Sequence, residues 1–235
     1  MKIHGLQKMT LLDYPGKVAC TVFFGGCDLR CPFCHNSALW DEAAPAALDD
    51  RALLDFLRRR RGLLDGVAVT GGEPLLRDLA PLLAEIKALG YPVKLDTNGF
   101  HPGRLRALLE AGLVDYVAVD IKNSPVRYAE TVGLPSLDLS PLRESAALLL
   151  GGGAPDYEFR TTAVDELHSA VDFRAIGEWI KGARRWFLQA FADRDSVPFS
   201  GLHPPSPALL AEYLDIVRPF VGYAALRGTD TTCEQ

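Results

Sequence analysis

Three cysteines near the start of the chain have types and spacing that could bind a metal centre. Cys27, Cys31 and Cys34 form a C-x3-C-x2-C pattern. Thiolates this close on one loop can converge on zinc or on an iron–sulfur cluster. A structural zinc site takes four protein ligands, and here His35 would have to be the fourth. A 4Fe–4S cluster held by three cysteines instead leaves one iron open to a small molecule. A Cys3His zinc site and three unconnected buried thiols are the alternatives.

Further polar residues follow segments that read as buried strands. Thr70-Gly71-Gly72-Glu73, Asp96-Thr97-Asn98 and Asp120-Ile121-Lys122 each end such a segment. Paired glycines let a ligand approach the backbone closely, although the same residues also make an ordinary turn. Carboxylates at apolar strand ends require a ligand, a cation or a lysine partner. Arg160 lies within a later strand and must either reach solvent or meet an anion.

Alternating strands and helices must position these residues. Strands are expected at 17–24, 65–70, 91–97, 114–122, 156–164 and 185–191, and helices at 48–60, 77–89, 102–111, 141–150, 171–181 and 207–217. Six strand–helix units predict parallel strands joined by right-handed crossovers. Because a complete barrel has eight units, we expect a partial, open (β/α)6 TIM-like barrel with its chemistry at the carboxyl ends of the strands.

Composition limits the class of protein. A chain of 235 residues with 48% hydrophobic residues suits one globular domain, with an N-terminal extension (1–16), a barrel core (17–220) and a C-terminal tail (221–235). The net charge of −5 argues against nucleic-acid binding. We find neither an apolar run of about 18 residues nor a signal peptide, so no membrane association and a cytoplasmic location are expected.

The cysteine pattern, with Phe33 as an aromatic residue before the third cysteine, resembles the cluster motif of radical S-adenosylmethionine (SAM) enzymes. This resemblance implies an enzyme with one 4Fe–4S cluster on Cys27, Cys31 and Cys34, whose open iron chelates SAM. The partial barrel is the fold of the same family. Cys20 is expected to be a core thiol and Cys233 a free thiol of the tail.

The strand-end segments add to this resemblance. Gly71-Gly72-Glu73 resembles the GGE motif of radical SAM enzymes, and LDTNGF and VDIK resemble segments of glycyl-radical-enzyme activases. The SAM contacts that follow from the resemblance are Phe33, Gly71, Gly72, Glu73, Asp96, Asn98, Lys122 and Arg160, and a monovalent cation beside SAM would lie on Asp96, Thr97 and Asp120. Pyruvate formate-lyase activases carry a histidine on the sixth strand, where this chain has Gln189-Ala190-Phe191-Ala192, and His203 follows later.

Residues 5–17, which could form a lid or an edge segment, resemble the opening of anaerobic ribonucleoside-triphosphate reductase activating proteins. The resemblance implies reductive cleavage of SAM to a 5′-deoxyadenosyl radical, which installs a glycyl radical on a partner enzyme. Anaerobic ribonucleotide reductase is the expected partner, and a flavodoxin- or ferredoxin-type protein the expected electron donor. The alternatives are another glycyl radical enzyme, a small-molecule or peptide substrate, and a metal-binding module without catalysis.

Overall fold

The structure is a computed structural model that describes residues 1–228. The chain forms two compact units, each assembled from separate segments. The first unit comprises Met1–Leu29, Asn36–Val119 and Ser140–Tyr157, and the second comprises Arg30–His35, Asp120–Leu139 and the chain from Glu158 onwards. Cys233 lies outside the described residues. Among the described residues, no helix combines the length and the apolar character needed to cross a bilayer.

Strands of the first unit form a row in the order β2-β3-β5-β6-β7. Strand β2 runs antiparallel to β3, whereas the remaining neighbours in the row are parallel. A short antiparallel pair, β1 and β4, stands apart from this row. The bounds of these strands are Lys2–Ile3 (β1), Gly5–Thr10 (β2), Ala19–Phe24 (β3), Leu48–Asp49 (β4), Gly66–Gly71 (β5), Val93–Thr97 (β6) and Tyr116–Asp120 (β7).

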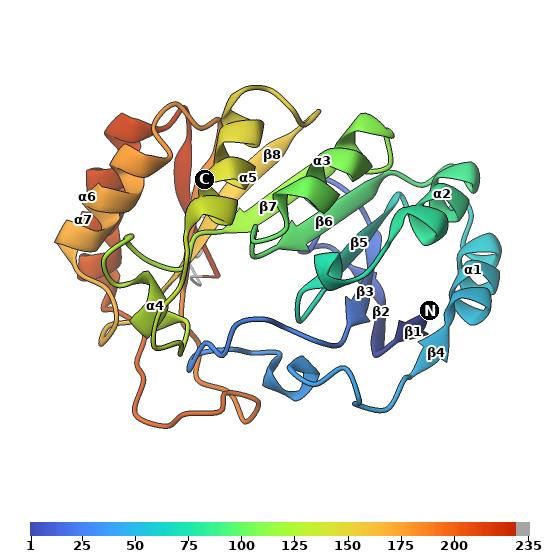
Figure 1. Ribbon diagram of the computed structural model, residues 1–235, viewed down its shortest axis with the longest axis horizontal. Coiled ribbons are helices and arrows are strands. Elements are labelled where there is room, and N and C mark those ends of the chain that lie inside the picture. The colour runs from blue at the N-terminus through green and yellow to red at the C-terminus, as the bar shows by residue number, and fades with distance from the viewer. Residues whose placement is uncertain (229–235) are drawn as a thin grey trace, which may run out of the picture. The chain divides into compact units, whose positions relative to one another are not determined.

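Three helices of the first unit connect these parallel strands, and a fourth, α5, follows β7 in the chain. Helices α1 to α3 follow one another along the outer side of β3, β5 and β6 (Figure 1). Asp49 caps the first of them by accepting a hydrogen bond from the amide of Ala52 at 2.8 Å. The helices are α1 (Asp50–Arg59), α2 (Ala80–Ala88), α3 (Pro102–Glu110) and α5 (Ser140–Leu150), with short 3-10 turns at Ser37–Leu39 and Pro74–Leu76.

The second unit contains a row of three parallel strands, β8-β9-β10. Trp186 of β9 is fully buried, and its indole Nε1 donates to Thr161 Oγ1 of β8 at 3.0 Å. Helices α6 and α7 lie side by side (Figure 1). The elements are α4 (Tyr128–Thr131), β8 (Tyr157–Ala163), α6 (Ala170–Trp179), β9 (Trp186–Ala190), α7 (Pro207–Val217), a 3-10 turn (Arg218–Phe220) and β10 (Ala224–Arg227).

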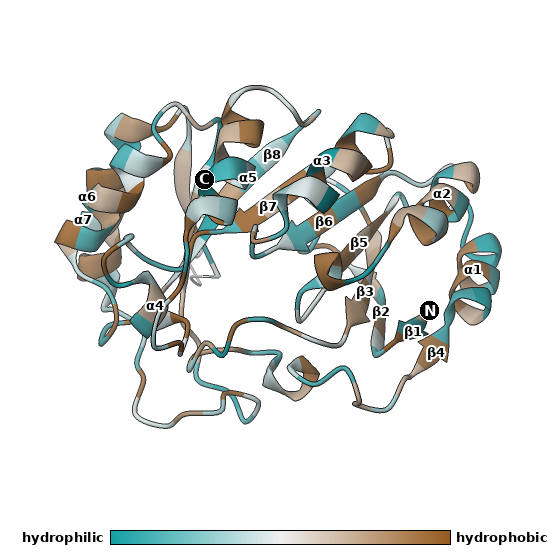
Figure 2. Cartoon of the chain, in the orientation of Figure 1, coloured by the Kyte–Doolittle hydropathy of each residue, from teal (hydrophilic) through white to brown (hydrophobic). Residues whose placement is uncertain are grey.

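Burial explains why the central strands are almost continuously apolar. The middle residues of β3, β5 and β7 are inaccessible to solvent, as expected for parallel strands covered on both faces. In Figure 2 the hydrophobic colour gathers on β5 and β7, whereas the hydrophilic colour is prominent on α1. Cys20 is completely buried in β3, which confirms the prediction of a core thiol.

All six predicted strands and all six predicted helices are present, with ends displaced by no more than three residues. Within residues 1–228, four strands beyond the six expected are present: the short pair β1 and β4, and two strands that extend the rows described above. The N-terminal extension contains the edge strand β2, and the segment expected to be a C-terminal tail contains β10, the parallel neighbour of β9. Each is recognisable only through its partner strand, because neither has a clear alternation of polar and apolar residues.

Candidate active site

The cysteine loop begins where β3 ends. Cys27 belongs to the first unit, is half-buried, and its amide donates to the carbonyl oxygen of Trp40 at 3.3 Å. Cys31 and Cys34 belong to the second unit, where the amide of Cys34 donates to the carbonyl oxygen of Cys31 at 3.1 Å. None of the three thiols is joined in a disulfide. They are therefore chemically available as metal ligands.

Gly71 and Gly72 bring the end of β5 against the loop that carries Cys27. The amide of Gly72 donates to the carbonyl oxygen of Phe24 at 2.8 Å, and the amide of Glu73 donates to that of Gly26 at 2.7 Å. A Cβ atom on Gly71 would lie 2.1 Å from the Phe24 oxygen, and one on Gly72 would lie 2.1 Å from the Gly26 oxygen. Both positions require glycine, because the backbones approach too closely for any side chain.

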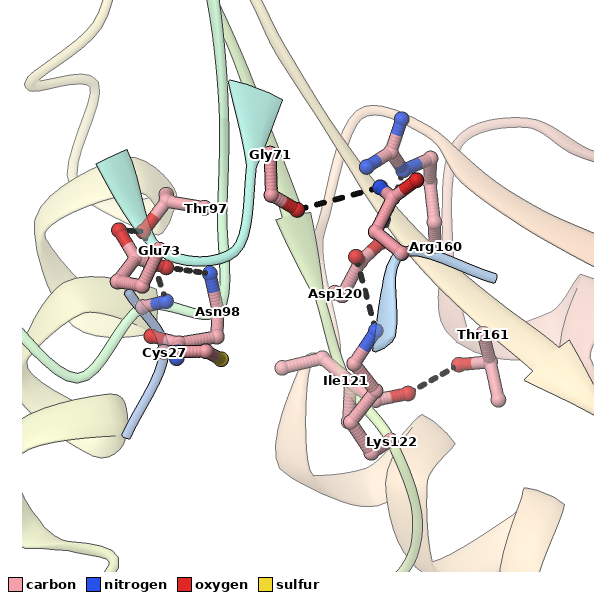
Figure 3. A network of polar contacts seen from close by, with 12 residues as sticks. Cys27, Gly71, Glu73, Thr97, Asn98, Asp120, Ile121, Lys122, Arg160 and Thr161 are labelled. Atoms are coloured by element: carbon pink, nitrogen blue, oxygen red, sulfur yellow. Dashed lines mark hydrogen bonds and ion pairs between the residues drawn. The ribbon is translucent and has the colours of Figure 1, made fainter. Parts of the chain in front are cut away.

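Glu73 is a fully buried carboxylate that ties the ends of β5 and β6 together. Its Oε1 accepts hydrogen bonds from the amide of Leu75 at 2.9 Å and from Thr97 Oγ1 at 2.8 Å, and its Oε2 accepts from the amide of Asn98 at 2.7 Å. Figure 3 shows the side chain directed at Thr97 and Asn98. Burial raises the pKa of Glu73 to about 7 despite these donors.

This raised pKa predicts a specific pH dependence of stability. The protonated form of Glu73 is favoured in the folded state, so its contribution is fully present below about pH 4.5 and is lost as the pH rises through about 7. The change is on the order of 3 kcal/mol. Glu73→Gln removes this titration. We therefore expect the unfolding free energy of the wild type, relative to that of the variant, to fall between pH 5 and 8.

Thermal or urea unfolding at several pH values measures this difference. Subtracting the variant from the wild type cancels the contribution of His203, whose pKa is raised in the folded protein by its hydrogen bond to Glu166. The pKa of His101 is raised mainly by its hydrogen bond to Asp28 and also by the charge of Glu73, so part of the His101 contribution changes with the substitution. Asp120, with a lowered pKa, contributes only at more acidic pH. A stability difference that is constant from pH 5 to 8 would contradict the prediction.

Asp96 near the end of β6 is paired with a lysine of the same strand. Lys94 is only 1% exposed, and its Nζ makes an ion pair with Asp96 Oδ1. This is the internal Asp–Lys pair that the sequence left open as an alternative. The Thr97 hydroxyl is also engaged, because it accepts a hydrogen bond from the amide of Gly99 at 3.1 Å in addition to donating to Glu73. These contacts stabilise the end of β6 without a ligand.

Asp120, Lys122 and Arg160 form a charged triad in the second unit. Asp120 Oδ2 accepts from Lys122 Nζ at 2.9 Å, and Asp120 Oδ1 accepts from Arg160 Nε at 2.8 Å (Figure 3). Burial alone would raise the pKa of Asp120, but the positive charges of Arg160 and Lys122 outweigh it and hold that pKa well below its usual range. Two cations around one carboxylate leave a net positive charge, which suits an anionic ligand group.

The backbone of Lys122 is bound by His168, a residue to which the sequence analysis assigned no role. The buried His168 accepts a hydrogen bond at Nδ1 from the amide of Val164 at 3.1 Å and donates from Nε2 to the carbonyl oxygen of Lys122 at 2.8 Å. Burial lowers the pKa of His168, so the neutral ring is favoured. It therefore connects the chain after β7 with the chain after β8. Nothing local in the sequence indicates a pairing over 46 residues.

His35 and Phe33, which flank the last cysteine, are both packed inside the second unit. The His35 ring stacks on Phe191 with centroids 5.7 Å apart, and its Nε2 donates to the carbonyl oxygen of Ala192 at 2.7 Å. Phe33 is 4% exposed. His203 is instead an exposed residue whose Nδ1 donates to Glu166 Oε1 at 2.6 Å. His35 thus connects the cysteine loop to the chain that follows β9.

Comparison with known proteins identifies the family to which this site belongs. The sequence profile of the Radical SAM superfamily matches residues 21–169, which include the three cysteines and the ends of β5, β6 and β7. The chain belongs to the radical SAM superfamily. It is therefore an enzyme, and the expected partial α/β barrel is confirmed as the fold.

Individual relatives are similar over different lengths. A "putative glycyl-radical enzyme activating enzyme" of Methanocaldococcus jannaschii is 28% identical over 99% of this chain and 98% of its own length. The pyruvate formate-lyase-activating enzyme of Clostridium pasteurianum is 37% identical over 52% of each chain. Streptococcus suis SuiB bound to S-adenosylmethionine is similar in structure, with a TM-score of 0.68 and 15% identity over 89% of this chain and 52% of that one.

Membership of the superfamily implies a 4Fe–4S cluster and SAM, and the donor set is compatible with both. Three thiols on one loop, none of them in a disulfide, match the ligands of a cluster with one open iron. Among residues 1–228, no three Cys, His, Asp or Glu side chains are already gathered as they would be around a metal ion.

Proposed function

We propose that this protein is a radical SAM activase that installs a glycyl radical on anaerobic ribonucleoside-triphosphate reductase. The observation that carries the activase assignment is similarity over the full length to the M. jannaschii activating enzyme, together with the spacing of the three loop cysteines. The partner is proposed from the resemblance of residues 5–17 to reductase activating proteins. We place the enzyme in the cytoplasm, with a flavodoxin- or ferredoxin-type protein as electron donor.

The chain's own task is to bind and orient its cofactors. Cys27, Cys31 and Cys34 would hold the cluster. When bound, the cluster supplies one electron that cleaves SAM into methionine and a 5′-deoxyadenosyl radical, which takes a hydrogen atom from the target glycine. The remaining roles proposed are SAM binding by Phe33, Gly71, Gly72, Glu73, Asp96, Asn98, Lys122 and Arg160, and cation binding by Asp96, Thr97 and Asp120.

The contacts of these residues suggest which group of SAM each of them would bind. The backbone at Gly71, which is buried, and at Gly72, which is half-buried, would face the amino group of SAM. Lys122 and Arg160 would hold its carboxylate, because together they exceed the charge of Asp120. Asn98 and Asp96 already have protein partners, so their proposed ligand contacts would be additional to those bonds.

Electron paramagnetic resonance under strict anaerobiosis tests the function. Reconstituted protein is mixed with reductant, SAM and the anaerobic ribonucleotide reductase of the same organism. We expect a glycyl radical doublet on the reductase and one 5′-deoxyadenosine released for each radical formed. A doublet on pyruvate formate-lyase but not on the reductase would overturn the choice of partner. No doublet and no 5′-deoxyadenosine from the cluster-loaded protein would overturn the activase assignment itself.

A further inference from the structure

Asp28, the residue directly after the first cluster cysteine, is held by two side chains from the end of β6. His101 Nε2 donates to Asp28 Oδ2 at 3.0 Å, and Asn98 Nδ2 donates to Asp28 Oδ1 at 2.5 Å. Both carboxylate oxygens are therefore engaged. All three residues and Cys27 belong to the first unit. None of the functions described above uses His101.

Both donors are themselves fixed by the backbone around them. His101 is the N-cap residue of α3, its carbonyl oxygen accepts from the amide of Leu105 at 3.0 Å, and Pro102 restricts its backbone. Asn98 Oδ1 accepts from the amide of Phe100 at 3.1 Å, which orients the amide group so that Nδ2 faces Asp28. His101 and Asn98 are thus held in place by their own backbone surroundings, and together they restrain the loop residue Asp28.

Restraining Asp28 affects the sulfur of Cys27 directly. The next amide, that of Leu29, donates to Cys27 Sγ at 3.5 Å, and Asp28 Oδ1 lies 4.0 Å from the same sulfur. Hydrogen bonds to ligand sulfurs stabilise added negative charge and raise the reduction potential of iron–sulfur clusters. A carboxylate beside the sulfur has the opposite effect unless a donor such as His101 offsets its charge.

We propose that His101 is a positioning residue for the cluster. It holds Asp28 so that the amide of Leu29 stays on Cys27 Sγ, and its hydrogen bond to Asp28 withdraws electron density from the carboxylate beside that sulfur. Through both effects His101 raises the reduction potential of the cluster. The inference rests on the cluster assignment and is independent of which partner enzyme is activated.

Redox titration of the reconstituted cluster, followed by electron paramagnetic resonance, tests this role. We expect His101→Ala to shift the midpoint potential to more negative values. His101→Gln, whose amide nitrogen can occupy a place similar to Nε2, should return the potential to near the wild-type value. The matched control is His203→Ala, which removes an exposed histidine–carboxylate pair outside the first unit and should leave the potential unchanged.

A second measurement needs no cluster. Amide hydrogen exchange in the metal-free protein should become faster at residues 28 and 29 in His101→Ala but not in His101→Gln. Potentials and exchange rates equal to those of the wild type in His101→Ala would overturn this inference alone. A His101→Gln variant whose midpoint potential shifts as far as that of His101→Ala would also overturn it. A wild-type protein that held no cluster would instead overturn the proposed function, and this inference with it.

Discussion

Replacing Cys31 by alanine is expected to abolish cluster assembly and SAM cleavage completely. Two remaining thiolates cannot hold a 4Fe–4S cluster with its usual three protein ligands. Iron and acid-labile sulfide should fall to background, and 5′-deoxyadenosine should fall to the level of a reaction without enzyme. Cys31 is a small side chain on a loop, 6% exposed, so circular dichroism should show the wild-type secondary structure.

The matched control is Cys20→Ala. Cys20 is the other buried thiol among the described residues, but it lies inside β3 rather than on the loop. Its replacement removes one buried sulfur from the core and should cost about 1–2 kcal/mol of unfolding free energy. Iron content and SAM cleavage should remain at wild-type values. Normal iron content in Cys31→Ala, or loss of iron in Cys20→Ala, would contradict the assignment of the ligands.

Replacing Gly72 by alanine has the second largest expected effect. Its Cβ would lie 2.1 Å from the carbonyl oxygen of Gly26 and 2.9 Å from that of Leu39. Both are backbone atoms, so the clash can be relieved only by moving the chain that leads into Cys27. We expect a loss of about 2–4 kcal/mol of unfolding free energy, together with lower iron content and weaker SAM binding.

Gly103→Ala is the control for this substitution. Gly103 lies in α3, and no heavy atom would come within 4 Å of an added Cβ. Alanine is a better helix former than glycine, so the variant should be as stable as the wild type or up to about 1 kcal/mol more stable. Urea unfolding measures the unfolding free energy of each variant, and isothermal titration calorimetry measures its affinity for SAM. A Gly72→Ala variant with wild-type stability and SAM affinity would contradict the close approach of the two backbones.

Several features of this site are local in the sequence and could be predicted from it. The spacing of Cys27, Cys31 and Cys34 places three thiols on one loop whatever the remainder of the chain does. Gly71 and Gly72 follow an apolar segment and mark the end of a strand. Alternating strand and helix patterns were sufficient for the parallel arrangement and the open barrel, because they depend on periodicity and on a general rule of handedness.

Other features depend on pairings between distant residues. Glu73 meets Thr97 and Asn98 only because β5 and β6 are neighbours with a particular register. The sequence alone did not indicate that these two residues would be partners of the carboxylate. Likewise, β2 could have been a lid until its pairing with β3 made it an edge strand.

The sequence by itself therefore determined the chemistry available to this protein: three thiolates, a glycine turn and charged residues at strand ends, in the order typical of a radical SAM enzyme. Only the tertiary structure decided which charges neutralise one another. Arg160 was one of several basic residues that could meet Asp120, and Asp28 had no evident partner before His101 was placed beside it. The physical reason is that an ion pair or hydrogen bond requires contact within about 3 Å, and contacts between residues far apart in sequence follow from strand order and register.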